Sequence, residues 1–295
     1  MNIYLARYSG FCFGVRRAIN LALEATGKGK QVYSLGELIH NPQYVTYLES
    51  KGIKNVCCVD DIDNAVFVIR SHGVTKEDIN KISESGNEII DATCPYVKRT
   101  HELIQNAIYE DYPVLILGDP NHPEVIGMRS YGDMRTQVVS PDDNIPPLTG
   151  KKLCIICQTT QKIGNLESLV CSVLPEVVEL KVYNTICLAT SQRQQSSACL
   201  AKSSDLMIVI GGKQSSNTKM LFSLCSDLTS TIHVETETEL SPEMLSGIRN
   251  IGLAAGASTP EETILAVYNK IKKINGDKDL ATSIEDIPLF KEESC

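Results

Sequence analysis

The sequence is short of positive charge and lacks long apolar runs. Lys and Arg number 28 against 36 Asp and Glu, which gives a formal net charge of −8. This balance argues against nucleic acid or an anionic membrane as a partner, because both bind clustered cations. No apolar run approaches the roughly 18 residues of a spanning helix. The N-terminal stretch contains Arg7 and lacks the cleavage site of a signal peptide. We therefore expect a cytoplasmic protein.

Nucleotide fingerprints and low-complexity linkers are also missing. No glycine-rich flavin or nicotinamide motif follows the N-terminal strand, and the segment IGGKQ is too short to be one. What is present is a globular composition, with 42% hydrophobic residues in a chain of 295. A chain of this length can bury a sizeable core and suggests about two domains, although one to three would be ordinary.

Nine short apolar runs end in glycine or polar residues, and most are followed by a helical pattern. They cover residues 2–12, 31–41, 65–74, 88–97, 112–125, 152–161, 180–194, 205–217 and 250–259. Continuous apolar strands that alternate with helices are typical of parallel sheets covered on both faces. Ligands of such sheets bind beyond the carboxyl ends of the strands. The polar ends of these runs are therefore the candidate site.

The nine runs form three sets of three, and each set has one strand ending in cysteine. Those cysteines are Cys12, Cys94 and Cys187, spaced 82 and 93 residues apart by subtraction. The pattern predicts an α/β protein of three similar small parallel-sheet domains around a pseudo-threefold axis. The predicted domains are residues 14–95, residues 96–188, and residues 1–13 with 189–276. An acidic C-terminal tail, 277–295, is expected to be partly ordered at best.

The chain has 11 cysteines, an odd number, and we expect no disulfides in a reducing cytosol. Cys154 and Cys157 form a CxxC inside a strand, where residues three apart face opposite sides, so we interpret both as core residues. For the remaining cysteines we predict strand packing at Cys57 and Cys58, helix packing at Cys171, Cys199 and Cys225, and no assigned role for Cys295.

Cys12, Cys94 and Cys187 differ because each ends a strand just before a helix. Free backbone N–H groups and the helix dipole favour a thiolate at such a position. Three converging thiolates suit zinc or an iron–sulfur cluster, and three ligands leave one coordination position open. On these grounds alone, three unrelated buried cysteines remain an equal alternative.

Nine segments, in order across residues 10–260, resemble the motifs of the 4-hydroxy-3-methylbut-2-enyl diphosphate reductase family. They are GFCFGVRRAI, HNPQYV, SHGV, DATCPYV, HPEVIG, QTT, ICLATSQRQ, GGKQSSNT and AGASTP. The resemblance implies a three-domain α/β trefoil around one [4Fe–4S] cluster held by three cysteines. By position, those ligands are Cys12, Cys94 and Cys187.

The resemblance also implies an iron–sulfur oxidoreductase at the end of the methylerythritol phosphate route to isoprenoids. Its reaction removes the allylic hydroxyl of 4-hydroxy-3-methylbut-2-enyl diphosphate with two electrons and two protons, giving isopentenyl and dimethylallyl diphosphates. The substrate hydroxyl would bind the open iron of the cluster, and Glu124 in HPEV would be the proton donor. Thr159 in QTT would hydrogen-bond the substrate oxygen and this acid. Without the neighbouring motifs, Glu124 would be a surface residue at a helix start and Thr159 a turn residue.

The strand ends offer few cations for a diphosphate, but they offer neutral donors. Imidazoles, hydroxyls and amides can bind phosphate when helix N-termini assist. His101 and His233 do not occupy equivalent strand ends, so we leave them as surface or core residues. The predicted substrate-binding residues are His40, His72, His122, Thr159, Ser215, Ser216, Asn217 and Ser258.

Two other readings remain open at this stage. One is a quinolinate-synthase-like or hydro-lyase iron–sulfur enzyme, for which we would expect more arginine at the strand ends. The other is a zinc-stabilised or phosphate-binding module without catalytic activity. Because the sequence lacks a flavin or nicotinamide motif, we expect ferredoxin or flavodoxin as the electron donor, and a monomer.

Overall fold

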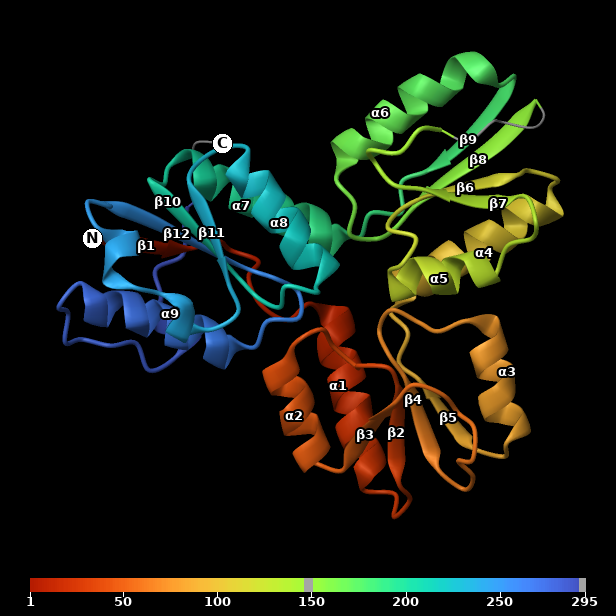
Figure 1. Ribbon diagram of the computed structural model, residues 1–295, viewed down its shortest axis with the longest axis horizontal. Coiled ribbons are helices and arrows are strands. Elements are labelled where there is room, and N and C mark those ends of the chain that lie inside the picture. Colours follow the sequence, from red (N-terminus) through yellow and green to blue (C-terminus); the bar gives the residue numbers. More distant parts are fainter. Residues whose placement is uncertain (146–150, 292–295) are drawn as a thin grey trace. The chain divides into compact units, whose positions relative to one another are not determined.

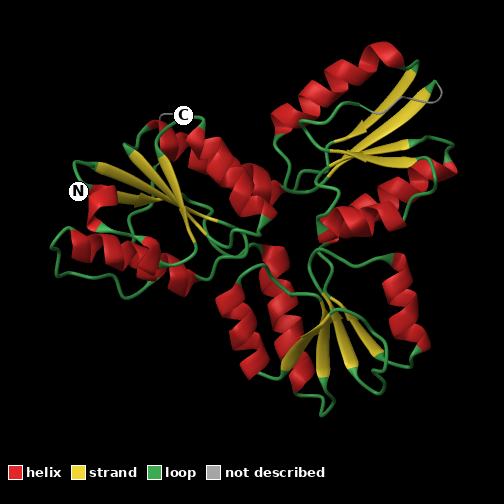
Figure 2. Cartoon of the chain, viewed as in Figure 1, coloured by secondary structure: helices red, strands yellow, loops and turns green. Residues whose placement is uncertain are grey.

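The computed structural model describes residues 1–145 and 151–291. In this part of the chain, twelve strands form three four-stranded sheets, and every strand pair is parallel. Helices follow most of the strands and lie on both faces of each sheet (Figures 1 and 2). The prediction of an α/β protein with three parallel sheets is confirmed.

The first sheet has the strand order β3-β2-β4-β5. Its strands are β2 (Val32–Leu35), β3 (Ile53–Val56), β4 (Val66–Ile69) and β5 (Glu88–Asp91). Its helices are α1 (Phe13–Thr26), α2 (Pro42–Ser50) and α3 (Lys76–Glu84), and β4 follows β3 without a helix between them. In the register of the sheet, Val32 lies opposite Ile53 on one side and Val66 on the other.

The second sheet has the order β7-β6-β8-β9. Its strands are β6 (Val114–Leu117), β7 (Thr136–Val139), β8 (Lys152–Cys157) and β9 (Glu179–Tyr183). Its helices are α4 (Pro95–Tyr109), α5 (Pro123–Ser130) and α6 (Ile163–Val173), which continues into the 3₁₀ turn Leu174–Glu176.

The third sheet has the order β1-β12-β10-β11. Its strands are β10 (Leu206–Ile210), β11 (Thr231–Val234), β12 (Asn250–Ala255) and the N-terminal β1 (Asn2–Leu5). The helices are α7 (Leu188–Lys202), α8 (Ser216–Ser226) and α9 (Glu261–Ile274), with 3₁₀ turns at Glu237–Glu239, Pro242–Leu245 and Ile284–Asp286.

The three sheets repeat one topology. When the third sheet is numbered from β10 and completed by β1, each sheet has the order second, first, third, fourth. The chain therefore reverses its direction of winding between the first and third strands of every sheet. In open parallel sheets this reversal creates a crevice at the carboxyl ends of the two strands, where ligands bind.

The second strands of the repeats are β3, β7 and β11; the sequence predicts no strand at β7 or β11, and it indicates β3 only through the strand packing expected at Cys57 and Cys58. Each is an edge strand of four residues and is only partly buried. Their short segments lack the continuous apolar run of buried neighbours such as β4 and β6, in which every residue is buried. Cys57 and Cys58 lie in the turn after β3 and are exposed, so their prediction as strand packing residues is wrong.

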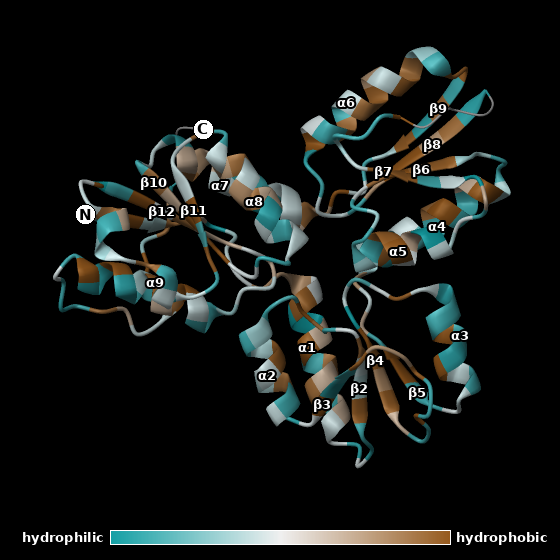
Figure 3. Ribbon diagram, viewed as in Figure 1, coloured by the Kyte–Doolittle hydropathy of each residue, from teal (hydrophilic) through white to brown (hydrophobic). Residues whose placement is uncertain are grey.

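Helices lie on either side of each sheet, and the hydropathy colouring shows that the strands between them are largely hydrophobic (Figure 3). In the second sheet, Cys154 packs on the side of α4 and α5, while Cys157 packs on the side of α6. Both are fully buried, and burial raises the pKa of the Cys154 thiol to about 12. Their interpretation as core residues on opposite faces is confirmed.

Among the helical cysteines, Cys225 and Cys199 are buried as predicted, but Cys171 on α6 is exposed. Cys171 lies on the outer side of its helix, away from the core-facing Leu166 and Leu169. Cys199 is disulfide-bonded, contrary to the expectation of no disulfides.

The chain forms two compact units. One holds the third sheet and comprises Met1–Phe13, His40–Tyr44 and the described residues from Leu188 onward; the other holds the first and second sheets and comprises Gly14–Ile39 and Val45–Cys187. The strands of each sheet fall within one of the three predicted domain ranges. The domain boundaries and the threefold arrangement stay predictions.

The C-terminal tail is more ordered than expected up to residue 291. Leu5 of β1 donates its N–H to the Pro288 carbonyl, and its own carbonyl accepts from the Phe290 N–H. The Ile287 side chain is buried in the core of the third sheet. Residues 292–295 of the predicted tail lie outside the described residues. Within residues 1–145 and 151–291, no helix combines the length and apolar composition of a bilayer span.

Candidate functional site

Glu124 is a buried carboxyl group in the first turn of α5, with 1% of its surface exposed. Its Oε1 accepts the backbone N–H of Thr159 at 2.7 Å, and its Oε2 accepts the Thr159 hydroxyl at 2.9 Å. Thr159 follows β8, the strand paired with β6, so the two residues meet at the crevice of the second sheet. The structure therefore brings the two predicted catalytic residues into direct contact.

Burial raises the pKa of Glu124 from 4.5 to about 7, and the two hydrogen bonds from Thr159 offset part of this effect. Removal from water disfavours the charged carboxylate, which is why the pKa rises despite these donors. A carboxyl group with a pKa near 7 can give up a proton at neutral pH and regain it. Glu124 is thus a suitable general acid rather than a surface residue.

His122 caps α5 immediately before Glu124. Its Nδ1 accepts the Glu124 backbone N–H at 3.1 Å, so a neutral ring carries its proton on Nε2 and can donate there. The His72 ring, at the end of β4, lies edge-on to His122 with the ring centroids 5.4 Å apart. Two of the predicted anion-binding histidines therefore lie together within the unit that holds the first two sheets.

The third sheet gathers a second group of predicted residues at the ends of β10 and β12. Ser215 caps α8, and its hydroxyl lies 3.4 Å from that of Ser258. The Ser258 hydroxyl also donates to the backbone carbonyl of His40 at 3.4 Å. Ser216 begins α8, and Asn217 is buried in its first turn. This group combines hydroxyls, an amide and a helix N-terminus in one place.

Asn217 has a buried side-chain amide that is available to bind a ligand. Only 5% of it is exposed, and within the described residues neither atom of its side-chain amide has a hydrogen-bond partner. The buried hydroxyl of the adjacent Thr218 is likewise unpartnered there. Buried polar groups left unpaired cost stability, so such a pair at a helix N-terminus indicates a site for a polar ligand.

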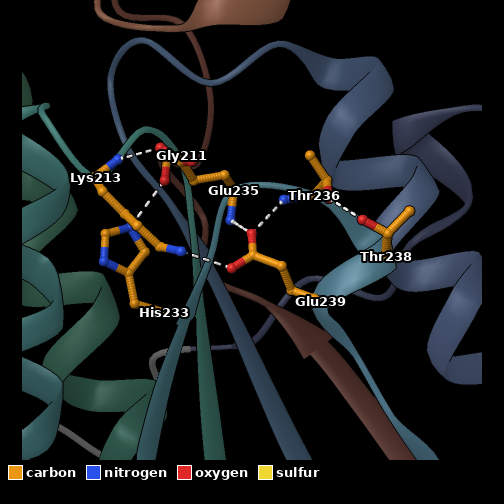
Figure 4. A network of polar contacts seen from close by, with 7 residues as sticks. All are labelled: Gly211, Lys213, His233, Glu235, Thr236, Thr238 and Glu239. Carbon is orange, nitrogen blue, oxygen red and sulfur yellow. Dashed lines mark hydrogen bonds and ion pairs between the residues drawn. The ribbon is translucent and has the colours of Figure 1, made fainter.

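The loop between β10 and α8 is held by a polar network (Figure 4). The Lys213 backbone N–H donates to the Glu235 carboxylate at 2.6 Å, and the Lys213 ammonium group pairs with the Glu239 carboxylate at 2.7 Å. His233 bonds the Gly211 carbonyl through Nε2 at 2.8 Å. A Cβ at Gly212 would lie 2.4 Å from the His40 carbonyl oxygen, so only glycine fits there. The network fixes the loop that presents Ser215 and Asn217.

The three cysteines set apart in the sequence occupy equivalent positions in the three sheets. Each follows the fourth strand of its repeat, is partly buried and immediately precedes or caps a helix: Cys12 before α1, Cys94 before α4 and Cys187 before α7. Each backbone N–H donates to a carbonyl beyond the third strand, those of Ala257, Ser71 and Thr159 respectively. The Thr159 residue that contacts Glu124 thus also holds the Cys187 loop.

These positions fit thiolate ligands. The three thiols are neither fully buried, as Cys154 is, nor exposed, as Cys57 is. Partial exposure beside the N-terminus of a helix leaves their sulfur atoms accessible to a soft metal centre.

One repeated feature of the site escaped the sequence analysis. Gly36, Gly118 and Gly211 each follow the first strand of a repeat, and their N–H groups donate to the last residue of the neighbouring edge strand. The fourth residue after each of these glycines is His40, His122 or Ser215. A search for a strand followed by glycine and, four residues later, by a side chain that can donate a hydrogen bond would have aligned the three repeats.

Comparison with known proteins agrees with this geometry. The family model described as "LytB protein" matches residues 3–272. A curated relative from Geobacter metallireducens is 42% identical over 280 residues, covering 94% of this chain and 99% of the relative; one from Trichlorobacter lovleyi is 41% identical over 277 residues, covering 93% and 99%. Both are named 4-hydroxy-3-methylbut-2-enyl diphosphate reductase.

Two solved structures are also similar. The Plasmodium falciparum E-1-hydroxy-2-methyl-but-2-enyl-4-diphosphate reductase superposes with a TM-score of 0.84 at 28% identity, covering 93% of this chain and 87% of that one. A structure of (E)-4-hydroxy-3-methyl-but-2-enyl diphosphate reductase, described as the terminal enzyme of the non-mevalonate pathway, gives 0.67 at 38% identity, covering 92% and 100%. With a family model matched over nearly the whole chain and relatives aligned almost end to end, this chain belongs to the LytB protein family.

Proposed function

We propose that this chain reduces (E)-4-hydroxy-3-methylbut-2-enyl diphosphate to isopentenyl and dimethylallyl diphosphates. The reaction consumes two electrons and two protons, breaks the allylic C–O bond and releases the oxygen as water. The observation that carries the proposal is the buried Glu124, held through both oxygens by Thr159, whose carbonyl in turn anchors the Cys187 loop. Names of relatives at 40% identity and above support the same reaction.

Glu124 would protonate the departing hydroxyl. Hydroxide is a poor leaving group, and an acid with a pKa of about 7 can transfer its proton at neutral pH. Thr159 would orient both the acid and the substrate oxygen, because its hydroxyl already points at the carboxyl group. Burial of this pair limits access of water to the reacting atoms.

Polar side chains would hold the diphosphate: His40, His72, His122, Thr159, Ser215, Ser216, Asn217 and Ser258. The unpartnered amide of Asn217 supports this role most directly. Without bound diphosphate, clustered lysines would repel one another, and these polar side chains avoid that repulsion. They also explain how a protein of net charge −8 could hold an anion.

Cys12, Cys94 and Cys187 would bind one [4Fe–4S] cluster. When bound, the cluster would supply the electrons and a Lewis-acidic iron with an open position for the substrate oxygen. Ferredoxin or flavodoxin as donor, a monomeric state and a cytoplasmic location stay predictions.

The deciding experiment is anaerobic purification with iron and sulfide analysis, then turnover of the allylic diphosphate with a strong one-electron donor. We expect four irons per chain and both products. A protein that holds zinc and has no reducible spectrum would indicate a zinc-stabilised module. An iron–sulfur protein inert toward the diphosphate would favour a hydro-lyase or quinolinate-synthase-like reaction.

A further inference from the structure

Two arginines lie on helices that begin directly after a cysteine, and each donates hydrogen bonds to backbone carbonyls just before another cysteine. Arg193, on α7 after Cys187, donates through Nη2 to the Gly10 carbonyl at 2.7 Å, two residues before Cys12. Arg17, on α1 after Cys12, donates to the Thr93 carbonyl at 3.4 Å and to the Asp91 carbonyl at 3.2 Å, just before Cys94.

The two contacts repeat one design. In each, the guanidinium group comes from the second turn of a helix that starts at one cysteine, and it holds the loop leading to another. Arg193 also donates through Nη1 to the Ala189 carbonyl in the first turn of its own helix at 3.1 Å. Two nitrogens of its guanidinium group are therefore held by backbone carbonyls. Gly10 has a φ of +89° and lies against Ile264 and Thr259, which allows this close turn.

A guanidinium group carries a positive charge at neutral pH. Two residues of chain span at most about 7 Å, so each charge lies roughly one Debye length or less from the backbone of a cysteine. Arg193 is 4% exposed, and its field is therefore little screened by solvent. Arg17 is partly exposed, and its field is weaker.

We infer that Arg193 and Arg17, which hydrogen-bond the loops before Cys12 and Cys94, are positioning residues whose charges make the cluster easier to reduce. The inference rests on the proposed function, since it assumes a cluster on these cysteines. Reduction adds one electron to the cluster and makes its charge more negative. A fixed positive charge nearby stabilises the reduced form and raises the reduction potential.

The chain supplies a matched control on α4. Arg99 follows Cys94 by five residues, as Arg17 follows Cys12. Its side chain is 61% exposed and pairs with Glu102 on the same helix instead of bonding a cysteine loop. Removal of the Arg99 charge should leave the cluster unaffected, because solvent and Glu102 screen it.

The test is an anaerobic redox titration of iron-loaded protein, followed by electron spin resonance of the reduced cluster. Arg193→Gln should shift the reduction potential to more negative values, and Arg17→Gln should shift it in the same direction by less. Arg17→Lys keeps the charge but loses the fork, and should stay close to wild type. Arg99→Gln should not shift. A role in loop geometry alone would instead move Arg17→Lys and Arg17→Gln together.

The inference is overturned if neither glutamine variant shifts further than Arg99→Gln, or if Arg17→Lys shifts as far as Arg17→Gln. If Arg193→Gln fails to retain iron, the three variants at Arg17 and Arg99 decide the question. A reducible wild-type cluster without turnover of the diphosphate would refute the proposed reaction and leave the inference standing. A wild-type protein that binds no iron under anaerobic conditions would refute both.

Discussion

Replacement of Glu124 by glutamine should lower turnover without destabilising the fold. Glutamine keeps the size of the side chain, but it cannot release a proton at neutral pH. Turnover should fall by about 10²–10⁴, the usual effect of losing a general acid, while iron content and diphosphate binding should be retained. An exposed glutamate in the first turn of α9, Glu262, provides the matched control: Glu262→Gln should leave turnover unchanged.

The same substitution should stabilise the fold at neutral and higher pH. Burial raises the pKa of Glu124 from 4.5 to about 7, so the native protein holds a proton that the unfolded chain has released. Native stability therefore falls as the pH rises from 4.5 to about 7 and levels off above it. With 1.36 kcal/mol per pKa unit, the loss amounts to about 3 kcal/mol. Glutamine stays neutral and escapes this loss.

The assay is denaturant unfolding of the iron-free chains at pH 5, 7 and 8.5 under reducing conditions. The stability of Glu124→Gln relative to wild type should increase from pH 5 to 7 and then stay constant. Wild-type turnover should fall about tenfold per pH unit above pH 7, because only about 3% of a group with this pKa is protonated at pH 8.5. A stability difference independent of pH, or full turnover by the variant, would refute Glu124 as a buried acid.

Three further predictions address the rest of the site. Serine at Cys12, Cys94 or Cys187 should abolish iron binding. By contrast, Cys154→Ser should keep iron and lose about 1–2 kcal/mol of unfolding free energy, and Cys171→Ser, at an exposed position, should change neither property. Iron analysis and denaturant titration check this, and full iron in one of the first three variants would contradict it. Plain diphosphate should inhibit in competition with the substrate, and Asn217→Ala should weaken its binding without altering the iron spectrum; unchanged inhibition would place the anion elsewhere. Gly212→Ala should lower both the melting temperature and diphosphate affinity, since its Cβ would meet a backbone oxygen at 2.4 Å; a variant with wild-type melting would show that this loop can move.

The sequence predicted the buried strands and the residues at their ends better than the sheet edges. β4, β6 and β10 are continuous apolar runs, and their polar ends lead directly to His72, His122 and Ser215. Edge strands such as β7 leave part of their surface to solvent, so polar residues interrupt the apolar pattern.

Contacts between distant segments could not be predicted from patterns at all. The bonds from Thr159 to Glu124 join two strand ends 35 residues apart, and that from Arg193 to Gly10 spans 183 residues. Short-range periodicity carries no information about such pairs. The family resemblance supplied the role of Glu124 and its hydrogen bond from Thr159, but only the burial of Glu124 accounts for a pKa near 7.

The place of β1 in the third sheet constrains the order in which the protein can assemble on the ribosome. β1 is synthesised first, yet it pairs with β12 in the register Asn2 to Asn250, and the segment around Leu289 then covers its other edge. The unit of Gly14–Ile39 and Val45–Cys187 can fold while translation continues, since domains fold as they emerge. The first strand must wait, unpaired, for the last. Cys12 therefore reaches its final position only after nearly the whole chain has been made, and iron should be loaded after translation rather than during it.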